Sequence, residues 1–375
     1  MTDTHTVPAH AELAVVGAGI VGALAAYYAT RRHPGRRVLV LSHSTPARPG
    51  ATGLSAGFDT PTGPTPAHRA LAARSTALFT GLAAELPESY RTPVDTYWLL
   101  RRDGVAALDA TLAVGGRTRA VPPERLPALR AALPGLRHGV DEVLRRSAPM
   151  TAGLPGRLAA LLLDRVLDHP GNAVRDGFRV TSARRARARA GTRIELTAAD
   201  GRRVTADKVL VAPGPWALNG PVAGAARARG ARVKKVVAFH VTAPPPAGAP
   251  ALVFEDADAF LLPHHPGGCW ILSVTSPDWD RDPDGPLTAD ARDRALARGL
   301  LDRYVPGFVP YLTDGRVGAD CFTPDRLPVV GTAGDPDVVM AIGGSGSGYR
   351  LAPAMAQDAL SLLDPVDEAR EGKLT

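Results

Sequence analysis

Residues 12–41 read ELAVVGAGIVGALAAYYATRRHPGRRVLVL. A short apolar run is followed by a glycine-rich turn, a helical stretch that ends near His33, and a second apolar run. This order, within about 30 residues, predicts a βαβ unit that binds the pyrophosphate of a dinucleotide. Gly17 permits the tight turn, Gly19 lets the backbone approach a phosphate, and Gly22 lets the helix pack on the strand. The N-terminus of the helix favours the anion.

The position after the second apolar run departs from this pattern. Such units usually carry Asp or Glu there to bind a ribose hydroxyl, but this chain has Ser42, followed by His43 and Ser44. The Ser42 hydroxyl can still bind ribose, more weakly than a carboxylate. A pocket for the 2′-phosphate of NADP is the alternative, with Arg48 as the nearby cation. The small, glycine-rich stretch 49–57 would let the backbone come close to a ligand.

Length and composition limit the class of protein. A chain of 375 residues suits two domains, and 45% hydrophobic residues are too many for general disorder. No run of about 18 apolar residues predicts a membrane span, and the N-terminus does not read as a secretory signal. Two cysteines, Cys269 and Cys321, are too few for a disulfide framework or a Cys-rich zinc site. We therefore expect a cytoplasmic enzyme without a metal site.

The charge pattern argues against a nucleic-acid partner. The formal net charge is +7, and only four of the 44 basic residues are lysines. A nucleic-acid-binding protein would gather its charge in a patch with interleaved aromatic residues. The densest basic run, residues 184–189, falls between two expected strands and contains no aromatic residue.

The rest of the chain predicts mixed α and β structure. We expect helices over 68–86, 155–168 and 289–304, the last one capped by Thr288, and short helices within 105–148. Expected strands are 96–100, 178–183, 193–197, 208–212, 233–241, 270–274 and 338–342. The last strand is followed by Gly343-Gly-Ser-Gly-Ser-Gly348 and a helix over 349–363.

Four segments resemble the FAD-dependent amine and amino-acid oxidoreductases that include glycine oxidase, D-amino-acid oxidase and monomeric sarcosine oxidase. They are VVGAGIVG (15–22), LTAADGRRVTADKVLVAPGPW (196–216), TPDRLPVVG (323–331) and VMAIGGSGSGYRLAP (339–353). They occur in the order that the family has. The resemblance implies FAD rather than NAD or NADP as the cofactor.

The resemblance also implies an interleaved α/β architecture. A Rossmann-like FAD-binding domain would consist of residues 1–70, 150–220 and 315–375. An α+β substrate domain containing an antiparallel sheet would consist of residues 71–149 and 221–314.

The cofactor-binding residues that follow from the motifs and the resemblance lie at the strand ends and glycine-rich turns. They are Gly17, Gly19, Ile20, Val21, Gly22, Ser42, His43, Thr52, Ser55, Ala56, Gly57, Val174, Ala212, Gly214, Trp216, Gly343, Gly344, Ser345, Gly346, Ser347, Gly348 and Tyr349. For the last turn there is also a physical argument. A flavin that accepts a hydride gains negative charge, which the backbone N–H groups of 343–348 and the N-terminus of the next helix could stabilise.

Three residues are candidates for catalysis. His264 and His265 follow an apolar run in the expected substrate domain, and either could accept a proton from the substrate ammonium group; a surface turn is the alternative. Arg350 lies two residues after the glycine-rich turn, where sarcosine oxidases carry a substrate-binding Lys, so the resemblance implies that it binds a carboxylate.

Three positions differ from the family. Leu272 stands where sarcosine oxidases carry a Lys implicated in oxygen activation. A dehydrogenase that passes its electrons to an acceptor other than O2 therefore stays open as an alternative. Asp320 stands where glycine oxidases carry a carboxylate-binding Arg; it would hold an ammonium group or face solvent. Cys321 is displaced from the place of the covalent flavin cysteine. We therefore expect non-covalent FAD, with attachment to Cys321 as the alternative.

The motifs and the family resemblance together imply oxidation of a C–N bond of an amine or amino acid to an imine, by hydride transfer to flavin N5. The partners would be that small molecule and O2 or another electron acceptor. Two alternatives stay open: oxidation of a 2-hydroxy acid by the same fold, and a catalytically idle flavoprotein subunit.

Overall fold

The computed structural model describes residues 10–43, 50–86, 90–188 and 191–364. Ser44 and Arg48, which entered the ribose and 2′-phosphate hypotheses, lie outside these residues. The chain forms two compact units, each of which brings together distant segments. Unit 1 contains residues 1–53, 155–232 and 320–375, and unit 2 contains residues 54–154 and 233–319. Which unit binds the cofactor and which the substrate stays a prediction.

Unit 1 is built on a mixed sheet. Its strands are β1 (His10–Val16), β2 (Val38–Leu41), β9 (Ala173–Arg175), β10 (Val180–Ala188), β11 (Gly191–Ala198), β12 (Arg203–Val211), β18 (Val329–Thr332) and β19 (Val338–Ile342). The order is β10-β11-β12-β1-β2-β9, and β19 pairs with both β12 and β18. Five of these strands are parallel, in the order β19-β12-β1-β2-β9.

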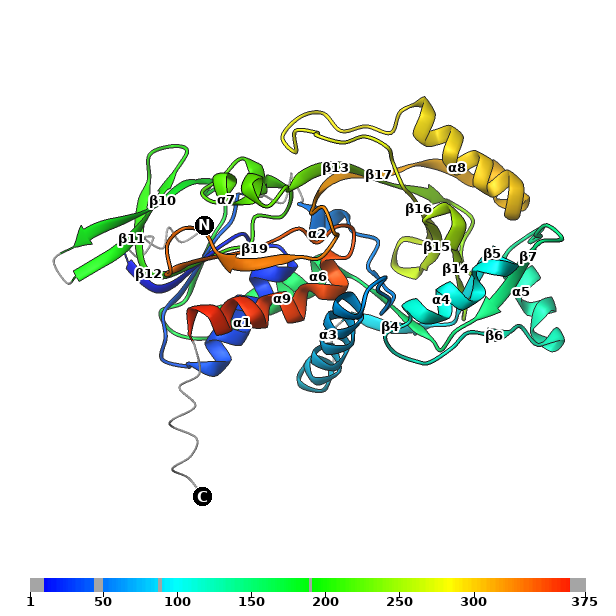
Figure 1. Ribbon diagram of the computed structural model, residues 1–375, viewed down its shortest axis with the longest axis horizontal. Helices are drawn as coiled ribbons and strands as arrows, with labels where there is room; N and C mark the ends of the chain where they lie inside the picture. The colour runs from blue at the N-terminus through cyan, green and yellow to red at the C-terminus, as the bar shows by residue number, and fades with distance from the viewer. Residues whose placement is uncertain (1–9, 44–49, 87–89, 189–190, 365–375) are drawn as a thin grey trace, which may run out of the picture. The chain divides into compact units, whose positions relative to one another are not determined.

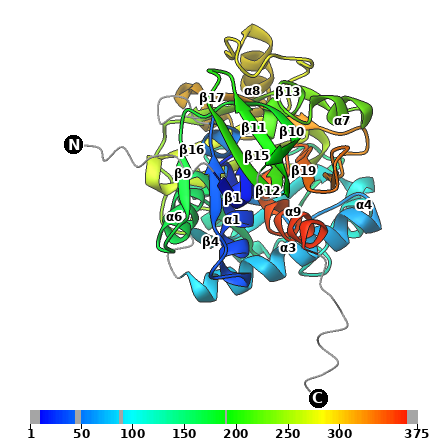
Figure 2. The same ribbon diagram turned by 90° about the vertical axis from the view of Figure 1, so that its left-hand side faces the viewer.

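The helices of unit 1 explain why its central strands read as apolar runs. These helices are α1 (Ile20–Arg32), α6 (Pro155–Leu167), α7 (Ala223–Ala228) and α9 (Gly348–Leu363), with the 3-10 helix η3 (Gly214–Leu218). Both α6 and α9 pack against α1, and α1 and α9 lie beside β1 and β12 (Figure 2). Every residue of β2 is buried, as expected for a parallel strand that is covered on both faces.

The register of the parallel strands fixes where the glycine turns lie. Val16 of β1 pairs with Val211 of β12, and Val211 pairs with Met340 of β19. The carboxyl ends of all three strands therefore lie at one edge of the sheet. The turns that follow β1 and β19 are two strand spacings, or roughly 10 Å, apart.

Unit 2 contains an eight-stranded, mainly antiparallel sheet in the order β17-β13-β16-β15-β14-β5-β7-β6 (Figure 1). Its strands are β5 (Thr96–Arg101), β6 (Arg119–Ala120), β7 (Glu142–Arg146), β13 (Arg232–Val241), β14 (Ala251–Phe254), β15 (Ala259–His264), β16 (Cys269–Val274) and β17 (Leu312–Phe322). A small sheet has the order β3 (Phe58–Asp59), β8 (Met150–Gly153) and β4 (Arg91–Val94).

Helices cover the core of unit 2. They are α3 (Pro66–Glu85), α4 (Val105–Thr111), α5 (Leu126–Ala132) and α8 (Ala291–Tyr304), while the short α2 (Ala51–Leu54) spans the boundary between the units. Short 3-10 helices are η1 (Arg102–Gly104), η2 (Pro123–Arg125), η4 (Glu255–Ala257), η5 (His265–Gly267) and η6 (Pro306–Tyr311). Trp270, Phe239 and Leu301 join β16, β13 and α8 in one apolar core.

The mixed α/β fold with an antiparallel sheet in the second unit is confirmed. Three local expectations were wrong. Residues 184–188, part of the basic run expected between two strands, belong to β10. Asp290, not Thr288, caps α8: its carboxylate accepts hydrogen bonds from the N–H groups of Arg292 and Asp293. The stretch 105–148 contains α4 and α5 but also the strand β7, which its Leu- and Arg-rich composition did not predict.

Candidate functional site

The first glycine turn, Gly17–Gly22, joins β1 to α1. Gly17 has a φ of +111°, and a Cβ placed there would lie 2.2 Å from the carbonyl oxygen of Ala212. A Cβ on Gly22 would lie 1.9 Å from the carbonyl oxygen of Gly17. Any side chain at either position would collide with backbone, so both glycines are required by the packing of the turn itself.

Gly19 and Thr52 complete this turn. Gly19 is the N-cap of α1 and contributes no side-chain hydrogen bond. The Thr52 hydroxyl accepts a hydrogen bond from the Ile20 N–H at 2.9 Å, and it is 3.0 Å from where a Cβ on Gly19 would lie. The first turn of α1 contains no acidic residue that would repel an anion at the helix N-terminus. Backbone of this kind fits a pyrophosphate.

The strand ends next to this turn bring several predicted cofactor-binding residues together. Ala212 directly follows β12, and its N–H donates to the carbonyl of Val16 at the end of β1. The rings of His43 and Trp216 meet edge to face with centroids 5.0 Å apart. Val174 lies in β9, paired with Val40. Val21 lies in the first turn of α1, Gly214 opens η3, and Ser42 is buried after β2.

Ser55, Ala56 and Gly57 belong to unit 2, unlike the other predicted cofactor-binding residues. The Ser55 hydroxyl accepts a hydrogen bond from the Gly57 N–H at 3.1 Å, and Gly57 has a φ of +74°. The glycine is therefore needed for the turn that leads into β3.

The second glycine turn, Gly343–Gly348, joins β19 to α9. Gly343 and Gly346 have φ angles of +76° and +79°, and between them Ser345 has a φ of +51°. A Cβ on Gly343 would lie 2.4 Å from the Thr323 side chain. The Ser345 hydroxyl accepts a hydrogen bond from the Thr323 N–H at 3.2 Å, which holds this strained residue in place.

Three N–H groups of the second glycine turn are engaged within the protein. The N–H of Ser345 donates to the carbonyl of Cys321, that of Ser347 to the carbonyl of Gly344, and that of Gly346 to the carboxylate of Asp320. These three donors are therefore used within the protein, whereas a role of the turn in stabilising flavin charge stays a prediction. The N-terminus of α9, which begins at Gly348 and includes Tyr349 and Arg350, is where that stabilisation fits.

Asp320 does not simply face solvent, and a role in holding an ammonium group stays a prediction. Its two carboxylate oxygens accept hydrogen bonds from the N–H groups of Cys321 at 2.8 Å and Gly346 at 2.7 Å. Burial raises the pKa of Asp320, although these two N–H groups act in the opposite direction. The carboxylate attaches the second glycine turn to β17.

Cys321 is buried, with 1% of its surface exposed. Burial and, after it, the charge of Asp320 raise the pKa of the Cys321 thiol to about 12. Because the thiolate is the nucleophilic form, this environment disfavours a covalent bond to a flavin. Non-covalent attachment stays our prediction.

The three predicted catalytic residues lie in different surroundings. Arg350 is half-buried in the first turn of α9, in unit 1. His264 ends β15 in unit 2, and His265 is exposed in the turn that follows. The Nε2 atom of His264 lies 3.1 Å from an Nη of Arg316. A guanidinium can only donate, so this nitrogen uses its lone pair as an acceptor and is poorly suited to act as a general base.

Arg316 is the functional candidate that the sequence did not reveal. It lies in β17 and donates to the carbonyl of Ser55 and to His264. Nothing in its sequence context separates it from the many other arginines of the chain. Leu272, by contrast, is fully buried in the core of unit 2, so no polar group is available at that position.

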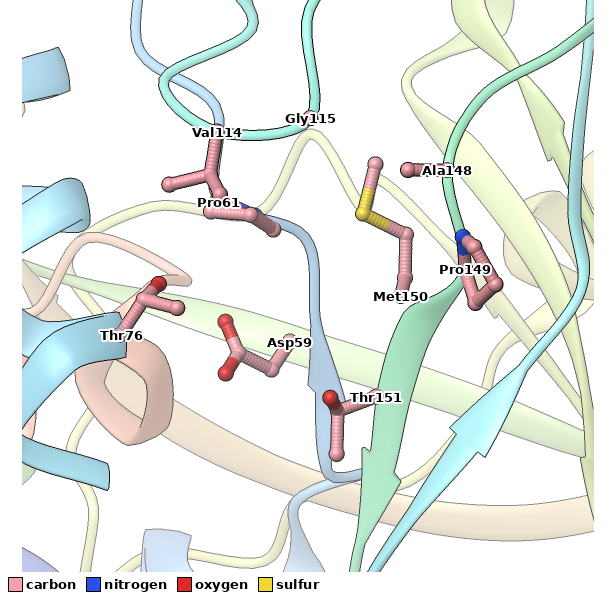
Figure 3. A pocket seen from close by; sticks show the side chains of 9 residues that line it. All are labelled: Asp59, Pro61, Thr76, Val114, Gly115, Ala148, Pro149, Met150 and Thr151. Atoms are coloured by element: carbon pink, nitrogen blue, oxygen red, sulfur yellow. The ribbon is translucent and has the colours of Figure 1, made fainter. Parts of the chain in front are cut away.

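A cavity of about 90 Å³ lies in unit 2 (Figure 3). It is lined by Asp59, Pro61, Thr76, Val114, Gly115, Ala148, Pro149, Met150 and Thr151. Asp59 is paired with Arg91 at 2.6 Å, and both side chains are less than 10% exposed. None of the predicted site residues lines this cavity, which has room for only a few water molecules.

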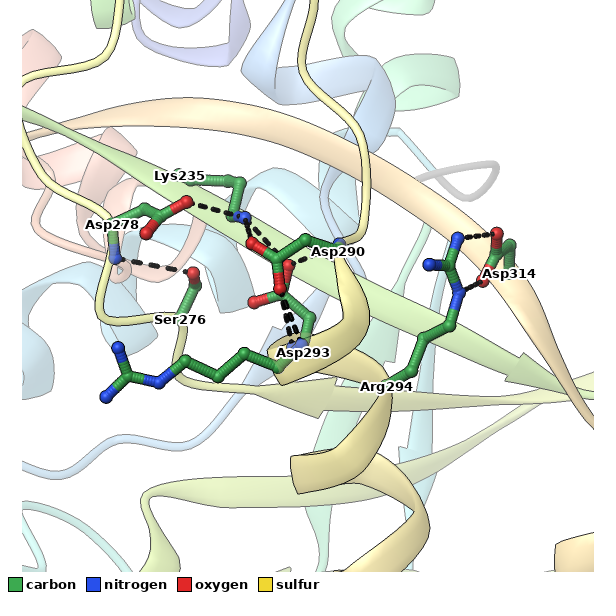
Figure 4. Close-up of polar contacts among 8 residues, drawn as sticks. Lys235, Ser276, Asp278, Asp290, Asp293, Arg294 and Asp314 are labelled. Carbon is green, nitrogen blue, oxygen red and sulfur yellow. Dashed lines mark hydrogen bonds and ion pairs between the residues drawn. The ribbon is translucent and has the colours of Figure 1, made fainter.

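A second polar cluster in unit 2 is structural in character (Figure 4). The ammonium group of Lys235 lies 2.7, 2.9 and 2.7 Å from carboxylate oxygens of Asp278, Asp290 and Asp293. Burial alone would lower the pKa of Lys235, but the three carboxylates outweigh it and raise the pKa above its ordinary value. The cluster joins β13 to the N-terminus of α8. Among the described residues, no group of acidic, His or Cys side chains is arranged to hold a metal ion.

Comparison with known proteins agrees with this geometry. Residues 12–362 match the model of the DAO family, described as FAD dependent oxidoreductase. No curated protein matches the sequence. Within the part of the chain that the structure describes, no helix has the length and apolar character needed to span a membrane.

Solved structures share the fold at low sequence identity. Iminodiacetate oxidase from Chelativorans sp. BNC1 is 19% identical, with a TM-score of 0.73 over 94% of this chain and 95% of that one. L-proline dehydrogenase from P. horikoshii is 19% identical, with a TM-score of 0.76 over 96% and 94%. Glycine oxidase from Bacillus cereus is 16% identical, with a TM-score of 0.76 over 94% and 97%.

Proposed function

The chain belongs to the DAO family of FAD-dependent oxidoreductases, and from that premise we propose that it oxidises a C–N bond of an amine or amino acid to an imine. The enzyme class and the FAD cofactor follow from the family. The substrate class is our proposal. It is supported by solved structures of the same fold that are named as iminodiacetate oxidase, L-proline dehydrogenase and glycine oxidase.

The observation that carries the proposal is the pair of glycine turns at one edge of the unit 1 sheet. Gly17 and Gly343 follow β1 and β19, which flank β12. In an open parallel sheet, ligands bind beyond the carboxyl ends of the strands. We infer that the first glycine turn and α1 hold the FAD pyrophosphate, and that the second turn and α9 lie at the flavin.

When bound, FAD supplies the acceptor for the substrate hydride. The residues of this chain would bind FAD and the substrate and orient them toward each other. The N-terminus of α1 meets the negative pyrophosphate, and the N-terminus of α9 favours negative charge on the reduced ring. We keep Arg350 as a candidate for binding a substrate carboxylate, and the buried Leu272 favours an electron acceptor other than O2.

The alternative, oxidation of a 2-hydroxy acid, needs the same fold and cofactor. Anaerobic mixing of the FAD-loaded enzyme with amines, amino acids and 2-hydroxy acids of matched carbon skeleton distinguishes the two. We expect nitrogen compounds alone to bleach the flavin absorption. Bleaching by hydroxy acids alone would replace the proposal with the alternative. If no member of the three classes reduces the flavin, the protein is instead a flavoprotein without this activity.

A further inference from the structure

An ionisable group, the carboxylate of Asp320, holds the second glycine turn. Its two oxygens accept hydrogen bonds from the N–H groups of Gly346 at 2.7 Å and Cys321 at 2.8 Å. Two other contacts of the turn with this segment are neutral: the N–H of Ser345 donates to the carbonyl of Cys321, and the Ser345 hydroxyl accepts from the N–H of Thr323. A protonated carboxyl group is a weaker acceptor than a carboxylate. The charge of Asp320 therefore decides how firmly the N–H of Gly346 is held.

This negative charge has no counterion beside it. Among the described residues, no Lys, Arg or His nitrogen lies within 4 Å of the Asp320 carboxylate. The turn 343–348 contributes only Gly and Ser, and Arg350 in the first turn of α9 forms no ion pair with Asp320. On β17 the adjacent titratable group is the Cys321 thiol, and the nearest cation in the sequence is Arg316, four residues earlier.

The surroundings already favour a proton on this carboxyl group. Burial is the largest influence and raises the pKa of Asp320, while the N–H groups of Gly346 and Cys321 lower it by less. A further negative charge nearby would raise this pKa again, because like charges disfavour the ionised form. Reduction of a flavin supplies such a charge.

The next step rests on the proposed function, in which the second glycine turn lies at the flavin. The carboxyl group of Asp320 then has a lower pKa beside oxidised flavin and a higher pKa beside reduced flavin. At any pH between these two values, it is ionised before reduction and protonated after it.

We propose that Asp320 takes up one proton from solvent when the bound flavin is reduced, so that flavin reduction in this enzyme is coupled to protonation of a protein carboxyl group. The flavin receives two electrons and one proton from the substrate as the hydride. Asp320 receives a second proton from water, and its carboxylate becomes a carboxyl group. When the electron acceptor removes the electrons, the proton on Asp320 returns to solvent. The uptake removes a negative charge that would oppose reduction and weakens the hold on the N–H of Gly346.

The test measures the midpoint potential of bound FAD against pH, with chemical reductant and reference dyes and without substrate. Asp320→Asn removes the ionisation and keeps the shape of the side chain. Asp325→Asn is the matched control, since Asp325 is an exposed carboxylate that accepts from the Leu327 N–H at 3.0 Å. All three proteins are kept in excess FAD, across the pH range in which they retain it.

We expect wild type and Asp325→Asn to show a pH window in which the potential falls twice as steeply as it does in Asp320→Asn. Each proton taken up with two electrons changes the equilibrium constant tenfold per pH unit, which is about 30 mV. The slope should therefore be about 60 mV per pH unit inside the window, against about 30 mV for Asp320→Asn.

Infrared difference spectra of reduced minus oxidised wild type separate Asp320 from a proton taken up by the flavin itself. We expect a protonated carboxyl band to appear on reduction, to shift with ¹³C-aspartate and to be absent in Asp320→Asn. If Asp320→Asn does not bind FAD, Asp320→Glu keeps an ionisable group, and the same band should lose its sensitivity to labelled aspartate.

Four results would overturn the inference: no steep window in wild type, a steep window that persists in Asp320→Asn, its loss in Asp325→Asn as well, or no aspartate-sensitive band on reduction. The proposed function fails separately, because these measurements use no substrate. If the window and the band depend on Asp320 but no nitrogen compound reduces the flavin, the proton coupling stands and the proposed reaction is wrong.

Discussion

Replacing Lys235 with methionine tests whether the cluster at the start of α8 is required for the stability of unit 2. The Lys235 side chain is 3% exposed and that of Asp293 is 1% exposed, with 2.7 Å between their charged atoms. Methionine fills most of the lysine volume but leaves the Asp293 carboxylate buried beside two other carboxylates. Removing one partner of a buried pair in this way typically costs about 3–5 kcal/mol.

The estimate depends on Asp293, because the other two carboxylates are partly in water. Asp278 is 33% and Asp290 is 48% exposed, so solvent screens their contributions. For a unit of this size, about 3–5 kcal/mol corresponds to a fall of roughly 6–20 °C in the unfolding midpoint. The assay is calorimetric unfolding of the FAD-loaded enzyme at pH 7.

Two further variants show whether the cause is the unpaired charge. Arg294 lies in α8, like Asp293, and forms an exposed pair with Asp314 of β17 (Figure 4). Arg294→Met breaks this pair and should shift the unfolding midpoint far less. The double variant Lys235→Met with Asp293→Leu removes both charges and should recover most of the loss. If Lys235→Met unfolds within 2 °C of Arg294→Met, or the double variant recovers nothing, the reasoning is refuted; the 2 °C limit is about 1 kcal/mol.

The same cluster has a defined pH dependence. Its hydrogen bonds, with Lys235 first, lower the pKa of Asp290 to about 2. A carboxyl group with a lowered pKa contributes stability above its unfolded pKa of about 3.9, and that contribution is lost as the pH falls toward 2. The difference in free energy of unfolding between wild type and Lys235→Met should therefore narrow as the pH falls through this window.

Two other predictions concern the second glycine turn and Cys321 in unit 1. Asp320→Asn keeps only one of the two acceptor oxygens that hold the second glycine turn, so we expect the FAD dissociation constant to rise about tenfold and the flavin reduction potential to increase. Asp325→Asn, at an exposed carboxylate that bonds to the Leu327 N–H, is the control, and equal effects in both variants would contradict the assigned role. Because Cys321 is buried and its pKa is raised, acid precipitation should leave the flavin in the supernatant; flavin found in the pellet would mean a covalent bond.

The parts of the fold that were predictable depend on local signals. The βαβ unit was predictable because Gly17 and Gly22 are required by contacts within the same 30 residues or with the neighbouring strand. The cap of α8 was assigned to the wrong residue. Thr288 and Asp290 are both good caps, and only the tertiary contact of Asp290 with Lys235 separates them.

The parts of the site that were missed depend on contacts between distant residues. The N–H of Gly346 bonds to a carboxylate 26 positions away, so the sequence of the turn gives no sign that this donor is used. Within the described residues no carboxylate pairs with Arg316, and its partners Ser55 and His264 lie 261 and 52 positions away. A missing partner leaves no pattern in a sequence.

The interleaving of the two units has a consequence for how the chain is synthesised. β1 needs β12, which lies about 200 residues later, and β19 follows only near the C-terminus. At about 5–20 residues per second, the apolar edge of β1 waits on the order of 10–40 s for its partner on the ribosome. Unit 2 ends at residue 319, so its last strand leaves the ribosome before the final segment of unit 1. We therefore expect unit 2 to be the first to complete its fold, and no single fragment ending before residue 320 to bind FAD.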